Sequence, residues 1–151
     1  MIATTNVGKM IEFINREISA LQSAGIDDIV ILTCSSVTQS PLNEEVVDER
    51  WRGSDVPFYS CRRFKGLEAD AVILVDINSD LWDDAELSGD YDSGDGLMFY
   101  TGASRAKHEL RLVFDMSETE SLAVLEKLGI QAQRKPLRSL ARRLNALIVP
   151  A

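Results

Sequence analysis

Hydrophobic positions near the start of the chain follow the spacing of one helix face. Apolar residues recur there at three- and four-residue steps, which is typical of an amphipathic helix. They are Val7, Met10, Ile11, Ile14, Ile18 and Leu21. Thr4, Thr5 or Asn6 can cap the first turn, and Gly25 suits the C-terminal end. We therefore predict a helix that begins near Val7 and buries one face.

Short apolar runs rich in Ile, Val and Phe predict strands. The runs are DDIVILT (27–33), VPFYSC (56–61), AVILVDI (71–77) and ELRLVF (109–114). Runs of this length and composition favour strands buried in a sheet. Residues 35–51 are expected to be irregular, with a helical turn around 44–50. The segment LMFYTGASRAKH (97–108) is expected to be a helix that leads into the last strand.

Two further helices are predicted near the end of the chain. Ser117 with Glu120 forms a capping box for a helix that ends at Gly129, and Pro136 suits the first turn of another. Their apolar positions are Leu122, Leu125 and Leu128 in the first and Leu137, Leu140, Leu144 and Leu147 in the second. Strands that alternate with helices imply an α/β fold with a mostly parallel sheet. We expect residues 1–151 to form one domain.

Composition narrows the classes of protein to consider. The chain has 45% hydrophobic and 26% charged residues, as in ordinary globular proteins. No apolar run reaches the ~20 residues that a membrane span needs, and no secretory signal follows Met1. Cys34 and Cys61 show no CxxC spacing, and a closed zinc site needs more ligands. We therefore expect a cytoplasmic protein with reduced thiols, no metal site and no membrane partner.

The net charge of −8 is unevenly distributed along the chain. Residues 76–95 hold eight acidic residues and no Lys or Arg, whereas residues 131–151 hold five basic residues and no acidic one. The overall charge therefore does not exclude a nucleic-acid partner. The basic segment could contact phosphates. We instead expect its leucines to pack on the domain while its arginines stay solvated.

Four patterns resemble known sites but lack essential residues. NVGKM at 6–10 lacks the upstream glycine and the Ser or Thr of a phosphate loop. Asp76 ends a buried strand without the acidic partners of a magnesium or phosphoryl site, so we expect it to face a loop. Residues 90–96 depart from a calcium loop and are expected to form a solvated acidic turn. His108 has no nearby nucleophile and is expected to be a surface histidine.

Two polar segments beside core strands combine residue types that suit a nucleotide. They are KGLE at 65–68, before the strand at 71–77, and SRAK at 104–107, before the strand at 109–114. Glycine lets backbone amides approach a phosphate closely. Glutamate can accept hydrogen bonds from ribose hydroxyls, and arginine offers a fork of donors to phosphate oxygens.

At these residues the sequence resembles the second RecA-like lobe of superfamily 1 DNA helicases of the UvrD/Rep/PcrA type. SCRRFKGLEADAVILVD (60–76) is similar to helicase motif V, and LMFYTGASRAKH (97–108) is similar to motif VI. Residues 27–36 lie where motif IV would begin, and an acidic loop (77–96) separates motifs V and VI. The resemblance implies a three-layer RecA-like, P-loop NTPase-like domain that lacks its own phosphate loop.

In such motors ATP is bound mainly by a first lobe, and the second lobe completes the site. The resemblance implies that Arg105 is the catalytic arginine finger that reaches the γ-phosphate. It implies that the backbone of Gly66 lies near that phosphate. Nucleotide contacts are implied for Lys65, Gly66 and Glu68, with Glu68 on the ribose, and single-stranded DNA contacts for Ser60 and Arg62.

The resemblance implies a function that these residues cannot perform alone. Because the sequence has no phosphate loop, we expect a fragment of a larger protein, namely the C-terminal lobe of an ATP-dependent DNA helicase or translocase. Expected partners are single-stranded or partly duplex DNA and the N-terminal helicase lobe, which would hold Mg²⁺. Two alternatives are a non-catalytic helicase-like module that docks a partner protein and a receiver-like domain phosphorylated at Asp76.

Overall fold

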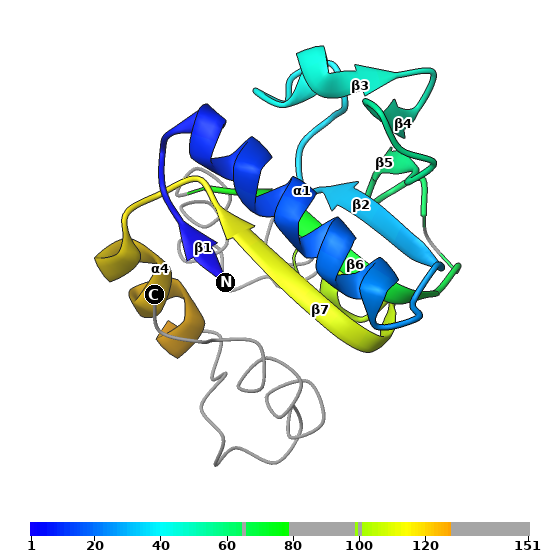
Figure 1. Ribbon diagram of the computed structural model, residues 1–151. Coiled ribbons are helices and arrows are strands. Elements are labelled where there is room, and N and C mark those ends of the chain that lie inside the picture. The colour runs from blue at the N-terminus through cyan, green and yellow to red at the C-terminus, as the bar shows by residue number, and fades with distance from the viewer. Residues whose placement is uncertain (65, 79–98, 100, 128–151) are drawn as a thin grey trace.

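The computed structural model describes residues 1–64, 66–78, 99 and 101–127. Its elements, in chain order, are β1 (Ile2–Ala3), α1 (Val7–Ser23), β2 (Ile29–Thr33), the 3₁₀ turn η1 (Asn43–Glu45), β3 (Val46–Val47), β4 (Arg50–Trp51), β5 (Phe58–Ser60), β6 (Ala69–Ile77), β7 (Ala106–Phe114) and α4 (Glu118–Lys127) (Figure 1). Helix α1 lies between β1 and β2, and α4 follows β7, as the hydrophobic pattern predicts, whereas β3 to β6 follow one another without an intervening helix.

Five of these strands form one sheet in the order β1-β7-β6-β2-β5. Every pairing between neighbours in this sheet is parallel. β6 lies in the middle of the sheet, and its side chains are almost all buried, as expected for a parallel strand that is covered on both faces. The prediction of an α/β fold with a mostly parallel sheet is confirmed.

Helix α1 covers one face of the sheet (Figure 1). Its N-cap is Asn6, whose side chain accepts a hydrogen bond from the backbone N–H of Lys9. Its buried side chains are Met10, Phe13, Ile14, Ile18 and Leu21, which confirms the predicted face. Gly25 follows the helix with a φ of 84°, a left-handed conformation that glycine adopts readily.

Two hydrophobic clusters, one on each face of the sheet, make the domain three-layered. The first joins α1 to β2, β6, β7 and the segment that follows β2. The second joins the opposite face to α4, Phe99 and Ala103. Along β6, Ile73 belongs to the first cluster and Leu74 to the second, because successive residues of a strand point to opposite faces.

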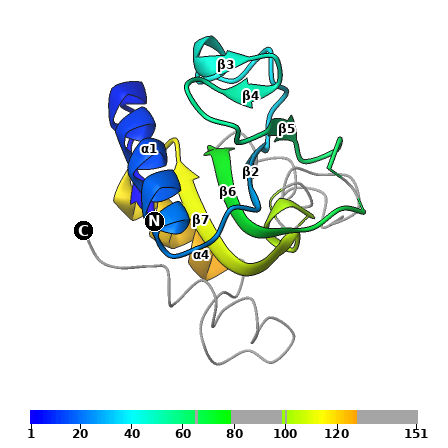
Figure 2. The same ribbon diagram turned by 45° about the vertical axis from the view of Figure 1, so that its right-hand side comes forward.

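A small antiparallel hairpin, formed by β3 and β4, lies beside the edge strand β5 (Figure 2). The helical turn predicted around residues 44–50 is therefore wrong over most of its length, since only η1 at its start is helical. Asp48 and Glu49 form the tip of the hairpin with φ values of 52° and 62°. Two left-handed residues give the turn the twist that a tight hairpin needs.

The helix predicted over 97–108 is too long. Residues 101–103 are helical, but residues 104 and 105 form a turn and Ala106 already belongs to β7. In α4 the backbone N–H of Glu120 donates to the Ser117 hydroxyl at 3.2 Å, so the predicted cap is confirmed. Leu122 is exposed rather than part of the buried face.

Several predicted elements lie outside the described residues. They are Leu128 and Gly129, where the helix was predicted to end, the part of the predicted acidic loop from residue 79 to 96, the calcium-like turn predicted at 90–96, and the helix predicted from Pro136 with its basic residues.

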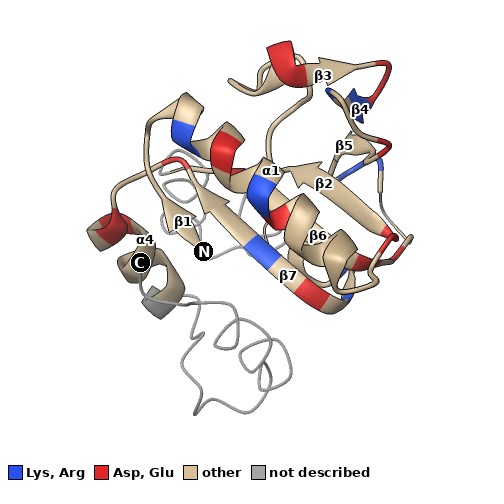
Figure 3. Cartoon of the chain, viewed as in Figure 1, with Lys and Arg blue, Asp and Glu red and all other residues tan. Residues whose placement is uncertain are grey.

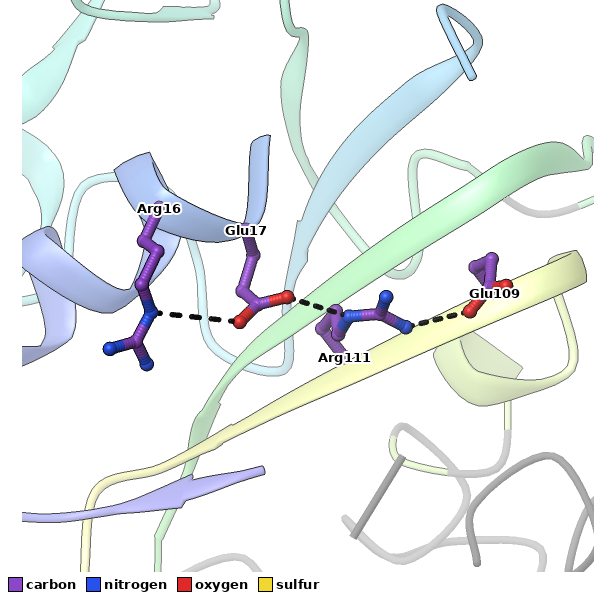
Figure 4. Close-up of polar contacts among 4 residues, drawn as sticks. All are labelled: Arg16, Glu17, Glu109 and Arg111. Carbon is purple, nitrogen blue, oxygen red and sulfur yellow. Dashed lines mark hydrogen bonds and ion pairs between the residues drawn. The ribbon is translucent and has the colours of Figure 1, made fainter. Parts of the chain in front are cut away.

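A chain of ion pairs fastens α1 to the central part of β7. The Arg111 side chain is only 17% exposed, and its Nε lies 2.8 Å from Glu17 of α1 while its Nη1 lies 2.8 Å from Glu109 (Figure 4). Arg16 adds a longer contact of 3.9 Å to Glu17. Acidic and basic residues alternate along α1 and β7, whereas the tip of the hairpin is acidic and β4 is basic (Figure 3).

Candidate functional site

The amino ends of β6 and β7 bring the two predicted nucleotide segments together. Ala69 and Ala106, the first residues of the two strands, are paired in register. The backbone N–H of Ala69 donates to the carbonyl of Arg105 at 3.0 Å. Glu68 and Arg105 are the residues that immediately precede this pair, so their backbones are neighbours although they are distant in sequence.

The Arg105 side chain is hydrogen-bonded through Nε, whereas its terminal nitrogens have no hydrogen-bond partner among the described residues. Its Nε donates to the carbonyl of Thr101 at 3.2 Å, and the Ser104 hydroxyl donates to the same carbonyl at 2.9 Å. The side chain is half-buried. A guanidinium has five N–H donors, and no further hydrogen bond of this side chain is found among the described residues. The terminal nitrogens are thus available to an anion.

The turn before β6 is open to solvent. Gly66 has a φ of 83°, and nothing lies within 4 Å of where a Cβ would be. Glycine is therefore required here by the left-handed backbone rather than by crowding. Glu68 is exposed and makes no ion pair with any residue that the structure describes. Lys65 lies outside the described residues.

The two predicted DNA contacts lie at the other end of the segment that connects β5 to β6. Ser60 is the last residue of β5 and pairs with Thr33. Its hydroxyl accepts a hydrogen bond from the backbone N–H of Arg63 at 3.3 Å, so it also stabilises a local turn. Arg62 is exposed, and in the described part of the chain it has no ion-pair partner.

The segment from 61 to 68 crosses one face of the sheet. It starts at the carboxyl end of β5, level with Val75 of β6, and it ends at the amino end of β6. Cys61 and Phe64 are buried in the second core cluster and hold it down. The structure thus connects Ser60 and Arg62 to Gly66 and Glu68 by a short, anchored path.

Gly102 lies in the helical turn that precedes Arg105, where it packs closely against the crossing segment and β6. A Cβ at this position would lie 2.5 Å from Cδ1 of Leu74 and 2.8 Å from Sγ of Cys61. Only glycine permits such an approach, because real Cβ contacts are not that short. Sequence reasoning did not identify Gly102 as a site residue. A glycine inside an otherwise helical pattern was the available signal.

Asp76 lies at the carboxyl end of β6 and faces Thr33 and the loop residue Ser40, but it is buried there, whereas a residue where the strand reaches the surface was expected to be exposed. The side chain is 2% exposed and its φ is 61°. The Thr33 hydroxyl donates to its Oδ2. Among the described residues Oδ1 has no hydrogen-bond partner, and the nearby Ser40 hydroxyl does not satisfy it.

Burial determines the titration of this group. Removal from water raises the pKa of Asp76, and the Thr33 and Ser40 hydroxyls only partly oppose that effect. The half-buried Asp115, next to the end of β7, also has a raised pKa, first because of burial and second because of the charge of Asp76.

Two of the other patterns have the structural setting that the sequence predicts, one inside a helix and one at the surface. Lys9 and Met10 of the phosphate-loop-like segment lie in α1, and Met10 is part of the core. His108 is exposed, but it lies in β7 rather than at a helix end, 3.9 Å from Asp70.

Part of the chain matches a known family. Residues 56–113 match the UvrD-like helicase C-terminal domain family. The match contains β5, the crossing segment, β6 and most of β7, which are the elements that carry the candidate site. No curated protein matches the chain. In the part of the chain that the structure describes, none of the helices has the length and apolar character of a membrane span.

Proposed function

We propose, because residues 56–113 match the UvrD-like helicase C-terminal domain family, that this chain is the second lobe of an ATP-dependent DNA helicase or translocase. In this proposal a first lobe with a phosphate loop binds most of the ATP and its Mg²⁺. The observation that carries the proposal is the hydrogen bond between Ala69 and Arg105, which places two polar segments of matching chemistry at one exposed edge.

The residues at this edge fit a nucleotide. The Arg105 guanidinium would lie on the charge that develops during phosphoryl transfer, and its bond to Thr101 would orient it beforehand. Glu68 would accept hydrogen bonds from ribose hydroxyls. The open space beside Gly66 leaves its backbone accessible to a phosphate. We assign Lys65 to the same contact as a positive charge.

Ser60 and Arg62 would contact single-stranded DNA from the other end of the crossing segment. Arg62 is exposed and would contribute to binding by neutralising a backbone phosphate. Because Cys61 and Phe64 anchor the segment between these residues and Glu68, strand binding and nucleotide binding would be mechanically connected. That connection is what a translocase needs.

Replacement of Arg105 tests the nucleotide assignment. In the intact motor that contains this lobe, Arg105→Ala should lower DNA-stimulated ATP hydrolysis by about 10³-fold or more, as for other arginine fingers. Binding of single-stranded DNA should change less than about twofold. Steady-state hydrolysis with and without DNA, together with an anisotropy titration, measures both quantities.

Lys9→Ala is the matched control, because Lys9 is an exposed cation of α1 and lies outside both candidate nucleotide segments. It should leave hydrolysis nearly unchanged. Equal turnover in the wild type and in Arg105→Ala would reject the arginine-finger assignment. The chain would then be better explained as a non-catalytic helicase-like module that docks a partner.

A further inference from the structure

A second arginine beside Arg62 is held by contacts that the proposed function does not explain. Arg63 is exposed, and its guanidinium carbon lies 4.9 Å from the centre of the Tyr59 ring. Its Nη1 forms an ion pair with Glu49 at the tip of the β3–β4 hairpin. The Tyr59 ring in turn stacks on Phe64, with centroids 6.3 Å apart. Arg63 is therefore placed by an aromatic ring and by a carboxylate.

The local charge favours an anionic ligand. Residues 48–65, which run from the hairpin tip to the crossing segment, contain five basic and three acidic residues, in a chain with a net charge of −8. Arg62 and Arg63 are adjacent, exposed and tied to the same turn, since the Arg63 backbone N–H donates to the Ser60 hydroxyl. A nucleic-acid backbone offers phosphates at regular spacing to such a pair.

Glu49 occupies a position where the backbone does not favour glutamate. Its φ is 62°, a left-handed value at which Gly, Asn and Asp are preferred. Its carbonyl accepts a hydrogen bond from the backbone N–H of Phe58 at 2.8 Å, which fixes the hairpin tip beside β5. The turn geometry therefore does not account for the glutamate side chain. Its contact with Arg63 does.

We propose that Arg63 is a second contact to the phosphate backbone of single-stranded DNA, and that Glu49 is a competing carboxylate that binds Arg63 until a phosphate displaces it. This inference rests on the proposed function. Carboxylate and phosphate are interchangeable partners for a guanidinium fork. The Tyr59 ring holds the guanidinium in place when Glu49 leaves, so the arginine stays oriented toward the strand.

The test measures binding of a fluorescein-labelled oligodeoxythymidine to the intact motor by anisotropy, at low and at physiological salt. Glu49→Gln preserves side-chain length but removes the competing charge, so its Kd should fall by about threefold to tenfold. Asp55→Asn is the matched control. Asp55 also pairs with an arginine, 3.4 Å from Nη1 of Arg50 in β4 of the hairpin, and its replacement should change the Kd less than about twofold.

If Glu49 competes with DNA for Arg63, the tighter binding of Glu49→Gln depends on the presence of Arg63. Arg63→Gln should raise the Kd and reduce the salt dependence of binding by about one phosphate contact. Glu49→Gln added to Arg63→Gln should then produce no gain. A Glu49→Gln variant that binds no more tightly overturns the inference, as does a gain that persists without Arg63 or is matched by Asp55→Asn.

Arg62→Gln separates failure of the inference from failure of the proposed function. If Arg62→Gln weakens binding and Arg63→Gln does not, the DNA contact stands and the role given to Arg63 and Glu49 is wrong. If neither change alters the Kd, the proposed DNA contact of this lobe fails as well.

Discussion

Charged residues differ in exposure between the amino ends of β6 and β7, here called the amino edge of the sheet, and the carboxyl ends, here called the carboxyl edge. At the amino ends of β6 and β7, Glu68 is exposed and Arg105 keeps donors that no described residue uses. At the carboxyl ends, Asp76 is 2% exposed and is bonded to Thr33. A charged group that is accessible can bind a ligand, whereas burial of a carboxyl group within the packed domain disfavours its ionised form.

The backbone marks both edges with an irregularity. One register shift between β6 and β7 places an extra residue on β7 just after Ala106, and another places an extra residue on β6 near Asp76. Such shifts redirect side chains. Ligands of open α/β sheets usually bind at the carboxyl ends of strands. In this domain the available polar groups of β6 and β7 instead lie at the amino ends.

Gly102→Ala should give the largest effect on stability, because it disturbs the packing of the helical turn that leads to Arg105. The added methyl group would lie 2.5 Å from Leu74 and 2.8 Å from Cys61. Overpacking of this kind costs about 1–3 kcal/mol of unfolding free energy. It should also displace the helix before Arg105 and lower ATP hydrolysis in the intact motor. Chemical denaturation and the hydrolysis rate measure the two effects.

Gly8→Ala is the control for a change of glycine to alanine in a helix. The new Cβ would contact only the exposed Asn6 side chain, at 3.2 Å, and alanine favours helix by up to about 1 kcal/mol. It should not lower hydrolysis. A Gly102→Ala variant as stable and as active as the wild type would contradict the claim that this contact supports the site.

Asp76→Asn should affect only the carboxyl edge, and by a smaller amount. The pKa of Asp76 is raised above 3.8 in the folded state. Between pH 3.8 and the folded pKa, the folded protein therefore retains a proton that the unfolded chain has lost. The free energy of unfolding therefore decreases as pH rises from about 3.8 through the folded pKa, and the loss persists above it. An asparagine at this position has no charge to bury and suits the left-handed backbone.

We expect Asp76→Asn to gain about 1 kcal/mol near neutral pH, in the range for one poorly satisfied buried polar group. Urea unfolding over a series of pH values should show a shallower decline than in the wild type, with the share of Asp115 still present. ATP hydrolysis should be unchanged. Loss of hydrolysis at full stability would mean that the carboxyl edge takes part in the reaction.

The sequence predicted the buried strands of the sheet more accurately than the residues at which those strands begin. The strands at β2, β5 and β6 could be read from local composition, because buried parallel strands are continuously apolar. β7 was predicted to begin at Glu109, three residues too late. Lys107 and His108 are exposed residues beside a register shift, so this part of the strand has no hydrophobic signature.

Burial of Asp76 could not be predicted from its neighbours in sequence. It depends on Thr33, which lies on the adjacent strand and is distant along the chain. The hairpin at β3 and β4 was missed for a different reason. Its turn is Asp-Glu rather than one of the glycine-containing pairs that normally signal a two-residue turn. The candidate nucleotide segments were found through family motifs, and their juxtaposition follows from strand pairing.

Hydrogen exchange of the intact motor, with and without a non-hydrolysable ATP analogue, tests the central claim most directly. We predict slower exchange at backbone amides 66–69 and 101–106 on nucleotide addition, and no change at 33–35 or 75–77. Protection at the carboxyl edge, or at neither edge while the analogue is bound, would contradict the assignment of the amino edge as the nucleotide face of this lobe.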